Sequence, residues 1–385
     1  MKRKLRGFAG SLERADLWLL AGVAVLLLLG SVVVYGAGSF NRQAAGSPLG
    51  QHYIISKHVL MIVVGLALMV GLMHLDYRWL RRRWLNWSLL AGTLALVAIT
   101  LFSDREINRW ITLFGFSVQP VEAAKIAVIF FLAERLTGLT SGRSLAGRQL
   151  ATALVLGPLP LIALLVLQPN FGNVMVVAGV TLVILFIAEV PGRWLAALVA
   201  VPMLGAVVAF RVVPKLATRL DAWLQGVRLG EYSYQVQQSL IGLGAGGVRG
   251  LGIGQSHNKF SFLPESHTDF AFSVLGEEWG LSGTLLVVIM LGLITWRGYG
   301  IAARAADPFG RVVAAGLTSG LAIYGVANIA MVTGIFPVVG VPLPFVSFGG
   351  TAMLAALASV GILFNIERGS RSYQVWKRRW DRSGT

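Results

Sequence analysis

Apolar residues occur along this chain in blocks of about 20, and short polar or basic segments separate the blocks. A helix rises about 1.5 Å per residue, so a block of this length crosses a hydrocarbon core of roughly 30 Å. The pattern therefore predicts an all-α integral membrane protein with about ten transmembrane helices. The predicted spans are residues 17–37, 54–74, 85–103, 119–137, 149–167, 172–190, 194–213, 268–295, 312–334 and 347–366.

Composition supports this class of protein. Hydrophobic residues make up 56% of the chain and charged residues 13%, whereas a soluble domain typically carries about a quarter charged residues. The length of 385 residues would suffice for about two or three soluble domains, so it is the composition that excludes them. The chain has no cysteine, which excludes disulfides, thiolate metal sites and cysteine nucleophiles.

The basic residues set the expected orientation. A net charge of +16 would also suit a nucleic-acid-binding protein, but the Lys and Arg residues lie in short clusters between the apolar blocks. Membrane proteins keep such clusters on the cytoplasmic side. With the N-terminus inside, about two thirds of the 33 Lys and Arg residues fall on inner segments. The sequence thus predicts a cytoplasmic N-tail (1–16), a basic cytoplasmic C-tail (367–385) and no nucleic-acid partner.

One long segment, residues 214–267, is not apolar enough to span lipid as a regular helix. It is rich in Gly, Gln, Ser and charged residues, yet it also contains aromatic residues such as Trp223 and Tyr232. Long connections of this kind are usually functional or disordered, and the aromatic content favours order. Non-helical backbone at membrane depth must be buried in protein or line a wet cavity. We expect an ordered, partly re-entrant extracytoplasmic cap.

Within this segment, the glycines from Gly242 to Gly247 formally match the GxGxxG pattern. A dinucleotide site also needs a preceding strand, a following helix and an acidic residue about 20 positions on. None of these fits the external loop of a helical membrane protein. The glycines are therefore expected to allow tight turns and close backbone packing.

Asp269 stands where the polar loop meets the eighth predicted span. Placing a carboxylate at this depth costs free energy unless water solvates it, a positive charge pairs with it or it serves a function. Asp269 is therefore a functional candidate. Partial desolvation would raise its pKa toward a value suited to a general base. Alternatively, Asp269 caps the following helix, a role that Thr268 could also fill. The residues alone favour these two interpretations equally.

A second polar group opens the fourth predicted span. Glu122 and Lys125 are three residues apart and can meet on one helix face. They form either a local ion pair that pins the helix or a substrate contact. Arg109, just before this span, is placed to meet an anionic headgroup. Together with Asp269 and Ser347, these residues all fall on the outer side, and they predict one outward-facing polar site.

At these residues the chain resembles the SEDS family (shape, elongation, division and sporulation), and its FtsW-like members more than its RodA-like members. The likeness runs in order over nearly the whole chain. The motifs that carry it are Arg109-Trp-Ile111, Gln119-Pro…Glu122…Lys125, Gln168-Pro169, Tyr234-Gln…Gly242, Leu263-Pro-Glu-Ser-His-Thr-Asp-Phe270, Gly276-Glu-Glu278 and Pro342-Leu-Pro…Ser347-Phe-Gly-Gly350.

The resemblance implies ten helices and polymerisation of lipid II outside the cytoplasmic membrane. The expected partners are a class B penicillin-binding protein and other division or elongation membrane proteins. A divalent cation, Mg or Mn, is expected without assigned ligands, and no organic cofactor is expected. The family pattern has an Asp where this chain has Asn170, so this side chain is not counted as a cation ligand. Asp269 falls on the family's essential acidic residue and is expected to be catalytic; the expected substrate-binding residues are Arg109, Glu122, Lys125, Lys259, Glu265, His267 and Ser347.

Two other functions fit a polar membrane protein of this kind. A flippase for the lipid-linked precursor would also need a polar cavity among broken helices, but it requires polar access from both faces, and the inner loops carry only basic clusters. A non-catalytic scaffold for the penicillin-binding protein would leave Asp269 and Lys125 without a purpose. The glycosyltransferase is the function that the sequence favours.

Overall fold

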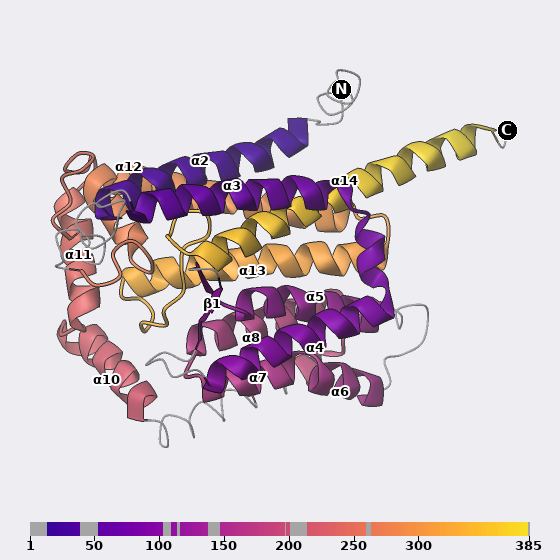
Figure 1. Cartoon of the computed structure of the whole chain (residues 1–385), viewed down its shortest axis with the longest axis horizontal. Coiled ribbons are helices and arrows are strands. Elements are labelled where there is room, and N and C mark those ends of the chain that lie inside the picture. Colours follow the sequence, from indigo (N-terminus) through magenta and orange to yellow (C-terminus); the bar gives the residue numbers. More distant parts are fainter. Residues whose placement is uncertain are drawn as a thin grey trace.

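A computed structural model describes residues 14–38, 53–102, 109–113, 116–137, 147–196, 198–200, 214–258 and 263–383. Most of the described residues are helical, and the long helices lie side by side along the longest axis of the molecule (Figure 1). The helices of this bundle are α2 (Arg14–Gly38), α3 (Tyr53–His74), α4 (Arg83–Ile99), α5 (Val121–Thr137), α6 (Gly147–Leu156), α7 (Pro158–Leu167), α8 (Phe171–Ile187), α12 (Ala271–Ala303), α13 (Pro308–Val332) and α14 (Gly350–Ser383).

Shorter elements connect these helices. The 3₁₀ helices η3 (Tyr77–Arg81) and η4 (Thr100–Phe102) flank α4. A two-stranded antiparallel hairpin, β1 (Ile111–Leu113) and β2 (Phe116–Val118), precedes α5. This hairpin was not among the elements predicted from the sequence.

The membrane-protein class is confirmed. Among the described residues, seven helical stretches are long and apolar enough to cross a membrane. Helices α5 and α8, with 17 residues each, are shorter but also match predicted spans. Nine of the predicted spans thus have a helix among the described residues. The remaining one, 194–213, lies largely outside them.

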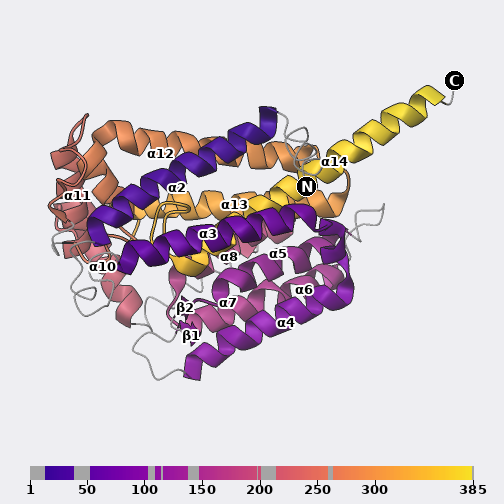
Figure 2. The ribbon, with the colours of Figure 1, turned by 45° about the horizontal axis from the view of Figure 1, so that its top comes forward.

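Helix α13 occupies the centre of the bundle. It packs against α12 on one side and against α5 and α8 on the other, and α14 packs against α3 (Figure 2). Large side chains such as Phe131, Phe309 and Phe345 are fully buried between these helices. The central position of α13 matters because two of its polar side chains face the candidate site described below.

The predicted span 149–167 is a helix pair rather than one helix. Gly157 and Pro158 separate α6 from α7. Proline lacks the amide hydrogen that would continue the helix. A Cβ added at Gly157 would lie 2.8 Å from the carbonyl oxygen of Ala153 and from a ring carbon of Phe131. Glycine is therefore required for the close packing at this break.

The segment predicted to be an ordered cap contains two helices, α10 (Pro214–Leu229) and α11 (Tyr234–Gly246), which lie across one end of the bundle (Figure 1). The described part of this segment, 214–258 and 263–267, contains these helices, as expected of an ordered cap, while its partly re-entrant course and its side of the membrane stay predictions. The glycines at the end of α11 pack closely, as expected. A Cβ at Gly246 would lie 2.0 Å from the carbonyl oxygen of Gly276 in α12.

Helix α12 is broken at Gly280, whose φ of 64° is unfavourable for other residues. The break frees backbone groups, and the segment that follows α11 bonds to them. Leu251 and Gly252 donate to the carbonyl oxygens of Glu277 and Glu278 at 2.9 and 3.0 Å. A kink in an apolar helix is tolerated when neighbouring backbone satisfies the freed groups in this way.

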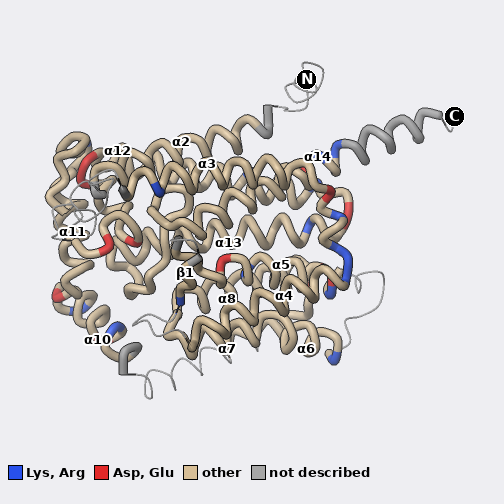
Figure 3. Tube along the Cα trace, in the orientation of Figure 1, with Lys and Arg blue, Asp and Glu red and all other residues tan. Residues whose placement is uncertain are grey.

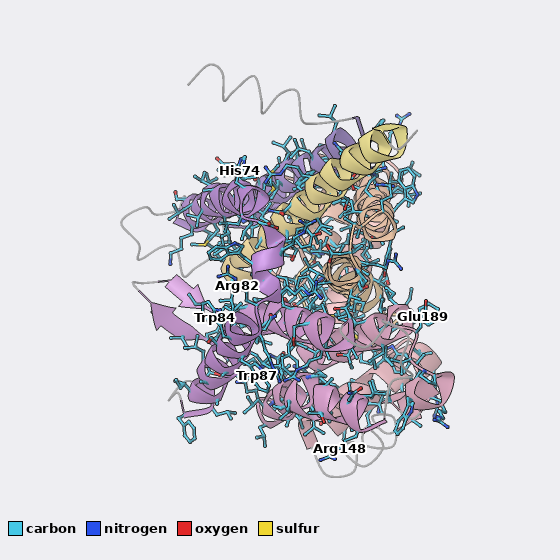
Figure 4. All side chains as sticks on the ribbon, turned by 90° about the vertical axis from the view of Figure 1, so that its right-hand side faces the viewer. His74, Arg82, Trp84, Trp87, Arg148 and Glu189 are labelled. Atoms are coloured by element: carbon cyan, nitrogen blue, oxygen red, sulfur yellow. The ribbon has the colours of Figure 1, made fainter. Side chains whose placement is uncertain are left out.

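The start of α2 and the end of α14 lie at the same end of the bundle, opposite α10 and α11 (Figure 1). Basic residues gather at this end, around η3 and α14 (Figure 3). Figure 4 looks onto it, with Arg82 and Arg148 labelled. The arrangement agrees with the predicted common side of both termini, because basic clusters mark the cytoplasmic side.

Candidate active site

Asp269 lies in a turn that leads into α12 and does not cap this helix. The N-cap residue is Phe270, and no side chain caps the helix. Thr268 does not fill the role either, because its hydroxyl donates to a carboxylate oxygen of Glu265 at 2.6 Å. The interpretation of Asp269 as a helix cap is therefore wrong.

The backbone at Asp269 is held by Asn328 of α13. The Asn328 amide donates to the carbonyl oxygens of Asp269 and of Val341, both at 2.7 Å. The Asp269 carboxylate lies against Gly340, where an added Cβ would be 3.3 Å from Oδ2. Gly340 has a φ of 67°. Two segments distant in sequence, α13 and residues 340–341, thus hold the turn that carries this carboxylate.

The surroundings of Asp269 tune it toward a base. Burial raises the pKa of Asp269 to about 7, and the negative charge of Glu265 acts in the same direction. The positive charges of Arg109 and Arg219 oppose this rise. A carboxylate with a pKa near neutral pH can both accept a proton and be regenerated in its charged form.

Arg109 reaches the site from the segment before β1. Its Nε donates to the carbonyl oxygen of Gln168 at 3.2 Å, and Nη2 donates to that of Pro169. The Gln168 amide in turn donates to Val97 O at 3.0 Å and Thr100 Oγ1 at 2.6 Å. Burial lowers the pKa of Arg109, and so does the like charge of Arg219.

Arg219 of α10 is a site residue that the sequence analysis missed. Its Nη1 donates to the carbonyl oxygen of Val338 at 3.2 Å, and its charge acts on both Asp269 and Arg109. No local motif marks it, since Arg219 is one of several basic residues in a polar segment. Only the tertiary arrangement brings it to Asp269.

Glu122 and Lys125 form the predicted ion pair, with Nζ and Oε1 2.8 Å apart and both side chains buried. Lys125 also donates to Asn173 Oδ1 at 3.0 Å and to the hydroxyl of Tyr324. The Tyr324 hydroxyl donates to Glu122 Oε1 at 2.8 Å. These three acceptors match the three N–H donors of an ammonium group. Lys125 as a substrate contact stays a prediction.

The ion pair lines a cavity of about 70 Å³ between α5, α8, α13, α14 and the segment 342–347. Glu122, Lys125, Tyr324 and Ser347 give it polar groups, and aliphatic side chains such as Val180 and Leu317 form much of the remaining wall. The cavity therefore offers a charged group beside an apolar surface.

The remaining predicted residues are placed as follows. Ser347 accepts a hydrogen bond from Leu343 N at 2.9 Å through its hydroxyl oxygen. The carbonyl oxygen of His267 accepts one from Phe348 N at 2.8 Å, and burial lowers the pKa of the His267 imidazole. Glu265 is exposed. Lys259 lies outside the described residues.

The predicted residues thus fall into two groups. Arg109 and Glu265 act on Asp269 through their charges, whereas Glu122, Lys125 and Ser347 line the cavity. Helix α13 joins the groups, because Tyr324 and Asn328 are one helical turn apart on it.

Glu277 belongs to neither group. It accepts hydrogen bonds from Ser256 Oγ at 2.5 Å and His257 N at 2.8 Å and so holds the loop before Asp269.

In the described part of the chain, no group of three His, Asp or Glu side chains could hold a metal ion. Magnesium is often held by one or two carboxylates together with substrate phosphates.

This fold and site define a polytopic membrane protein with a partly buried acid at one end of its bundle. The model of the FtsW/RodA/SpoVE family, described as cell cycle proteins, matches residues 17–372. The chain belongs to this family, which confirms the family expected from the sequence motifs.

Relatives match over nearly the whole chain. A probable peptidoglycan glycosyltransferase FtsW of Geobacter metallireducens is 32% identical, and the match covers 92% of this chain and 95% of the relative. Stage V sporulation protein E of Bacillus subtilis is 33% identical, and the match covers 92% of this chain and 98% of the relative. The FtsW and sporulation names agree with the expected likeness to FtsW.

Solved structures share the fold. A chain of a peptidoglycan synthase complex, described as coordinating polymerization and crosslinking, matches with a TM-score of 0.72 and 29% identity, covering 91% of this chain and 97% of that chain. The rod shape determining protein RodA of Thermus thermophilus matches with a TM-score of 0.64 and 27% identity. This match covers 91% of this chain and 95% of that chain.

Proposed function

We propose that this protein is a peptidoglycan glycosyltransferase that polymerises lipid II at the outer face of the cytoplasmic membrane. The observation that carries the proposal is Asp269, a carboxylate with a pKa of about 7 in the turn before α12, whose backbone Asn328 of α13 holds in place. The glycosyltransferase names of its full-length relatives support the same activity.

In the proposed reaction, the Asp269 carboxylate takes the proton from the 4-hydroxyl of the acceptor sugar. The hydroxyl oxygen attacks the anomeric carbon of the donor, the bond to the diphosphate oxygen breaks, and the configuration at that carbon inverts. The diphosphate leaves with the bonding electrons. A second carboxylic acid is not needed, unlike in most glycoside hydrolases, because a diphosphate is a stable leaving group.

The diphosphate needs positive charge. Arg109 and Arg219 supply it near Asp269, and the predicted contacts Lys125 and Lys259 would add to it. A magnesium or manganese ion bound to the diphosphate would supply further charge. The proposed proton transfer and attack do not depend on this ion. The cavity beside Lys125, with its apolar wall, suits a polyprenyl diphosphate.

The proposed partner is a class B penicillin-binding protein, which would cross-link the glycan that this chain makes. The similarity to a chain of a peptidoglycan synthase complex supports the pairing. Other division or elongation membrane proteins are further proposed partners.

Reconstitution of the purified protein with lipid II tests this function against transport. Polymer and flipping are assayed in the same vesicles, with protein-free vesicles as the control. A glycosyltransferase gives glycan polymer without accelerated flipping. Accelerated flipping without polymer would make the protein a flippase. If neither activity is detected, the result favours the non-catalytic scaffold.

A further inference from the structure

A second cavity, of about 190 Å³, lies between α10, α11 and the segment 336–338. One buried water needs roughly 10–15 Å³ on this measure, so the cavity has room for a considerably larger group. The proposed reaction assigns no role to this cavity. Its wall includes Arg219, Trp223, Tyr232, Ser233 and Gln235.

Two aromatic side chains of this wall, Trp223 and Tyr232, are held by the protein. The Trp223 indole donates to the carbonyl oxygen of Gly334 at 3.1 Å. Tyr232 packs so closely on Gly226 and Gly334 that a Cβ at these glycines would lie 2.2 and 3.0 Å from its ring. A wall whose side chains are already ordered loses little entropy when a ligand binds.

Polar side chains of the wall remain available to a ligand. Ser233 is the N-cap residue of α11, but its side chain makes no capping hydrogen bond. Gln235 is partly buried, and its side chain has no hydrogen bond to the part of the chain described here. Hydroxyl and amide groups beside ordered aromatic rings are suited to a neutral molecule with hydroxyl and acetamido substituents.

The cavity adjoins Asp269. Arg219 belongs to its wall and also acts on Asp269 through its charge. Val338 belongs to the wall as well. Gly340, two residues further along the chain, lies against the Asp269 carboxylate. A molecule that fills the cavity would therefore lie next to the groups that the reaction uses.

We propose that this cavity is a saccharide subsite that holds one N-acetylated sugar ring of the glycan, with Trp223 and Tyr232 beside the ring and Ser233 and Gln235 bonding its substituents. The proposal rests on the proposed glycosyltransferase function. The sugar belongs either to the incoming lipid-linked unit or to the growing strand, and the kinetic experiment below distinguishes these sources.

The absence of native cysteine permits a direct binding test. Ala222→Cys places a single thiol in the cavity wall, and Gln237→Cys places a control thiol on the exposed side of α11. Both are made in the Asp269→Asn protein, so that bound sugar is not consumed. The rate of maleimide labelling is then measured with a short β-1,4 oligomer of N-acetylglucosamine, with a cellulose oligomer and with pyrophosphate.

The acetylated oligomer should slow labelling of the cavity thiol about tenfold at saturation and leave the control thiol unchanged. Equal labelling rates with and without it, or protection by pyrophosphate alone, would overturn the subsite. This measurement does not need turnover. If wild-type protein makes no polymer, the glycosyltransferase proposal fails while the labelling still reports on the subsite.

Steady-state kinetics locate the bound sugar in the reaction. Gln235→Ala removes one hydrogen bond, which corresponds to a change of about tenfold in affinity. A higher KM for lipid II with unchanged product length assigns the subsite to the incoming unit, and shorter products with unchanged KM assign it to the growing strand. Unchanged KM and unchanged length in both Gln235→Ala and Trp223→Phe would contradict the proposal.

Discussion

The side-chain amide of Asn328 binds the backbone carbonyl of Asp269 at 2.7 Å and that of Val341 at the same distance. Asn328 is fully buried in the central helix α13. A single side chain thus ties the turn that carries the candidate base to the segment against which its carboxylate rests.

Replacing Asn328 by Leu should lower both stability and activity. The change leaves two carbonyl groups without this donor, and each unpaired buried group costs about 1–3 kcal/mol. We expect a lower Tm and a reduced kcat, because the turn at Asp269 loses its support. Thr181→Val is the matched control, since the Thr181 hydroxyl donates to the carbonyl oxygen of Val177 within α8. An unchanged Tm and kcat in Asn328→Leu would show that this contact is dispensable.

The pH dependence of the reaction should follow Asp269. A base must be charged to act, so the single-turnover rate should fall about tenfold per pH unit below a pKa of about 7. Glu265 raises this pKa, so Glu265→Gln should shift the acid limb to lower pH. Arg109 lowers the pKa, so Arg109→Gln should shift the limb upward. Glu231→Gln, which changes an exposed carboxylate, should leave the limb in place.

A shift in the opposite direction for either variant would contradict the electrostatic account of Asp269. A pH-independent rate between 5 and 8 would remove Asp269 as the titrating base.

The role of Lys125 can be separated from its ion pair. Lys125→Met alone strands the buried Glu122 carboxylate, and breaking such a pair costs about 3–5 kcal/mol. Glu122→Gln with Lys125→Met removes both charges and should restore folding. We expect this double variant to remain inactive, because the positive charge for the diphosphate is still missing. Thermal unfolding and polymer assays measure the two effects separately.

Tyr324→Phe is the control for Lys125, since it removes a hydrogen-bonding partner and keeps the charged pair. Much activity in the folded double variant would assign Lys125 to the ion pair alone.

The orientation is tested with reporters that work only in the cytoplasm. Fusions after Arg83 or in the C-tail should be active, because basic clusters surround these positions. A fusion near Ser256, in the loop that Glu277 holds, should be inactive. The reverse pattern would place the candidate site on the cytoplasmic side and overturn the proposed function.

Much of the fold could be predicted because lipid imposes long apolar helices. The predicted span 54–74 and α3 (Tyr53–His74) agree almost to the residue. The end of a helix could be predicted less well where the helix continues into polar residues. The last predicted span ends at residue 366, whereas α14 runs to Ser383, so the expected C-tail is largely a helical extension.

The site could be predicted only in part. Local spacing was enough to pair Glu122 with Lys125, because residues three apart share a helix face. Arg219 and Asn328 act on Asp269 across about 50 and 59 positions of sequence, and no local pattern reveals such contacts. The capping role of Asp269 stayed open for a different reason: a sequence pattern fixes the start of a helix only to within a few residues, and α12 begins at Ala271, with Phe270 as its N-cap residue.

Polymer formation by Asp269→Asn tests the central claim most directly. The substitution keeps the size of the side chain and removes its basicity, and a lost general base costs about 10²–10⁴ in rate. Purified wild-type and variant proteins in vesicles with lipid II are compared for glycan polymer at equal folded amounts, judged by Tm. We predict polymer from the wild-type protein and a loss of at least about a hundredfold in a folded variant. Near-normal polymer from Asp269→Asn would contradict the account.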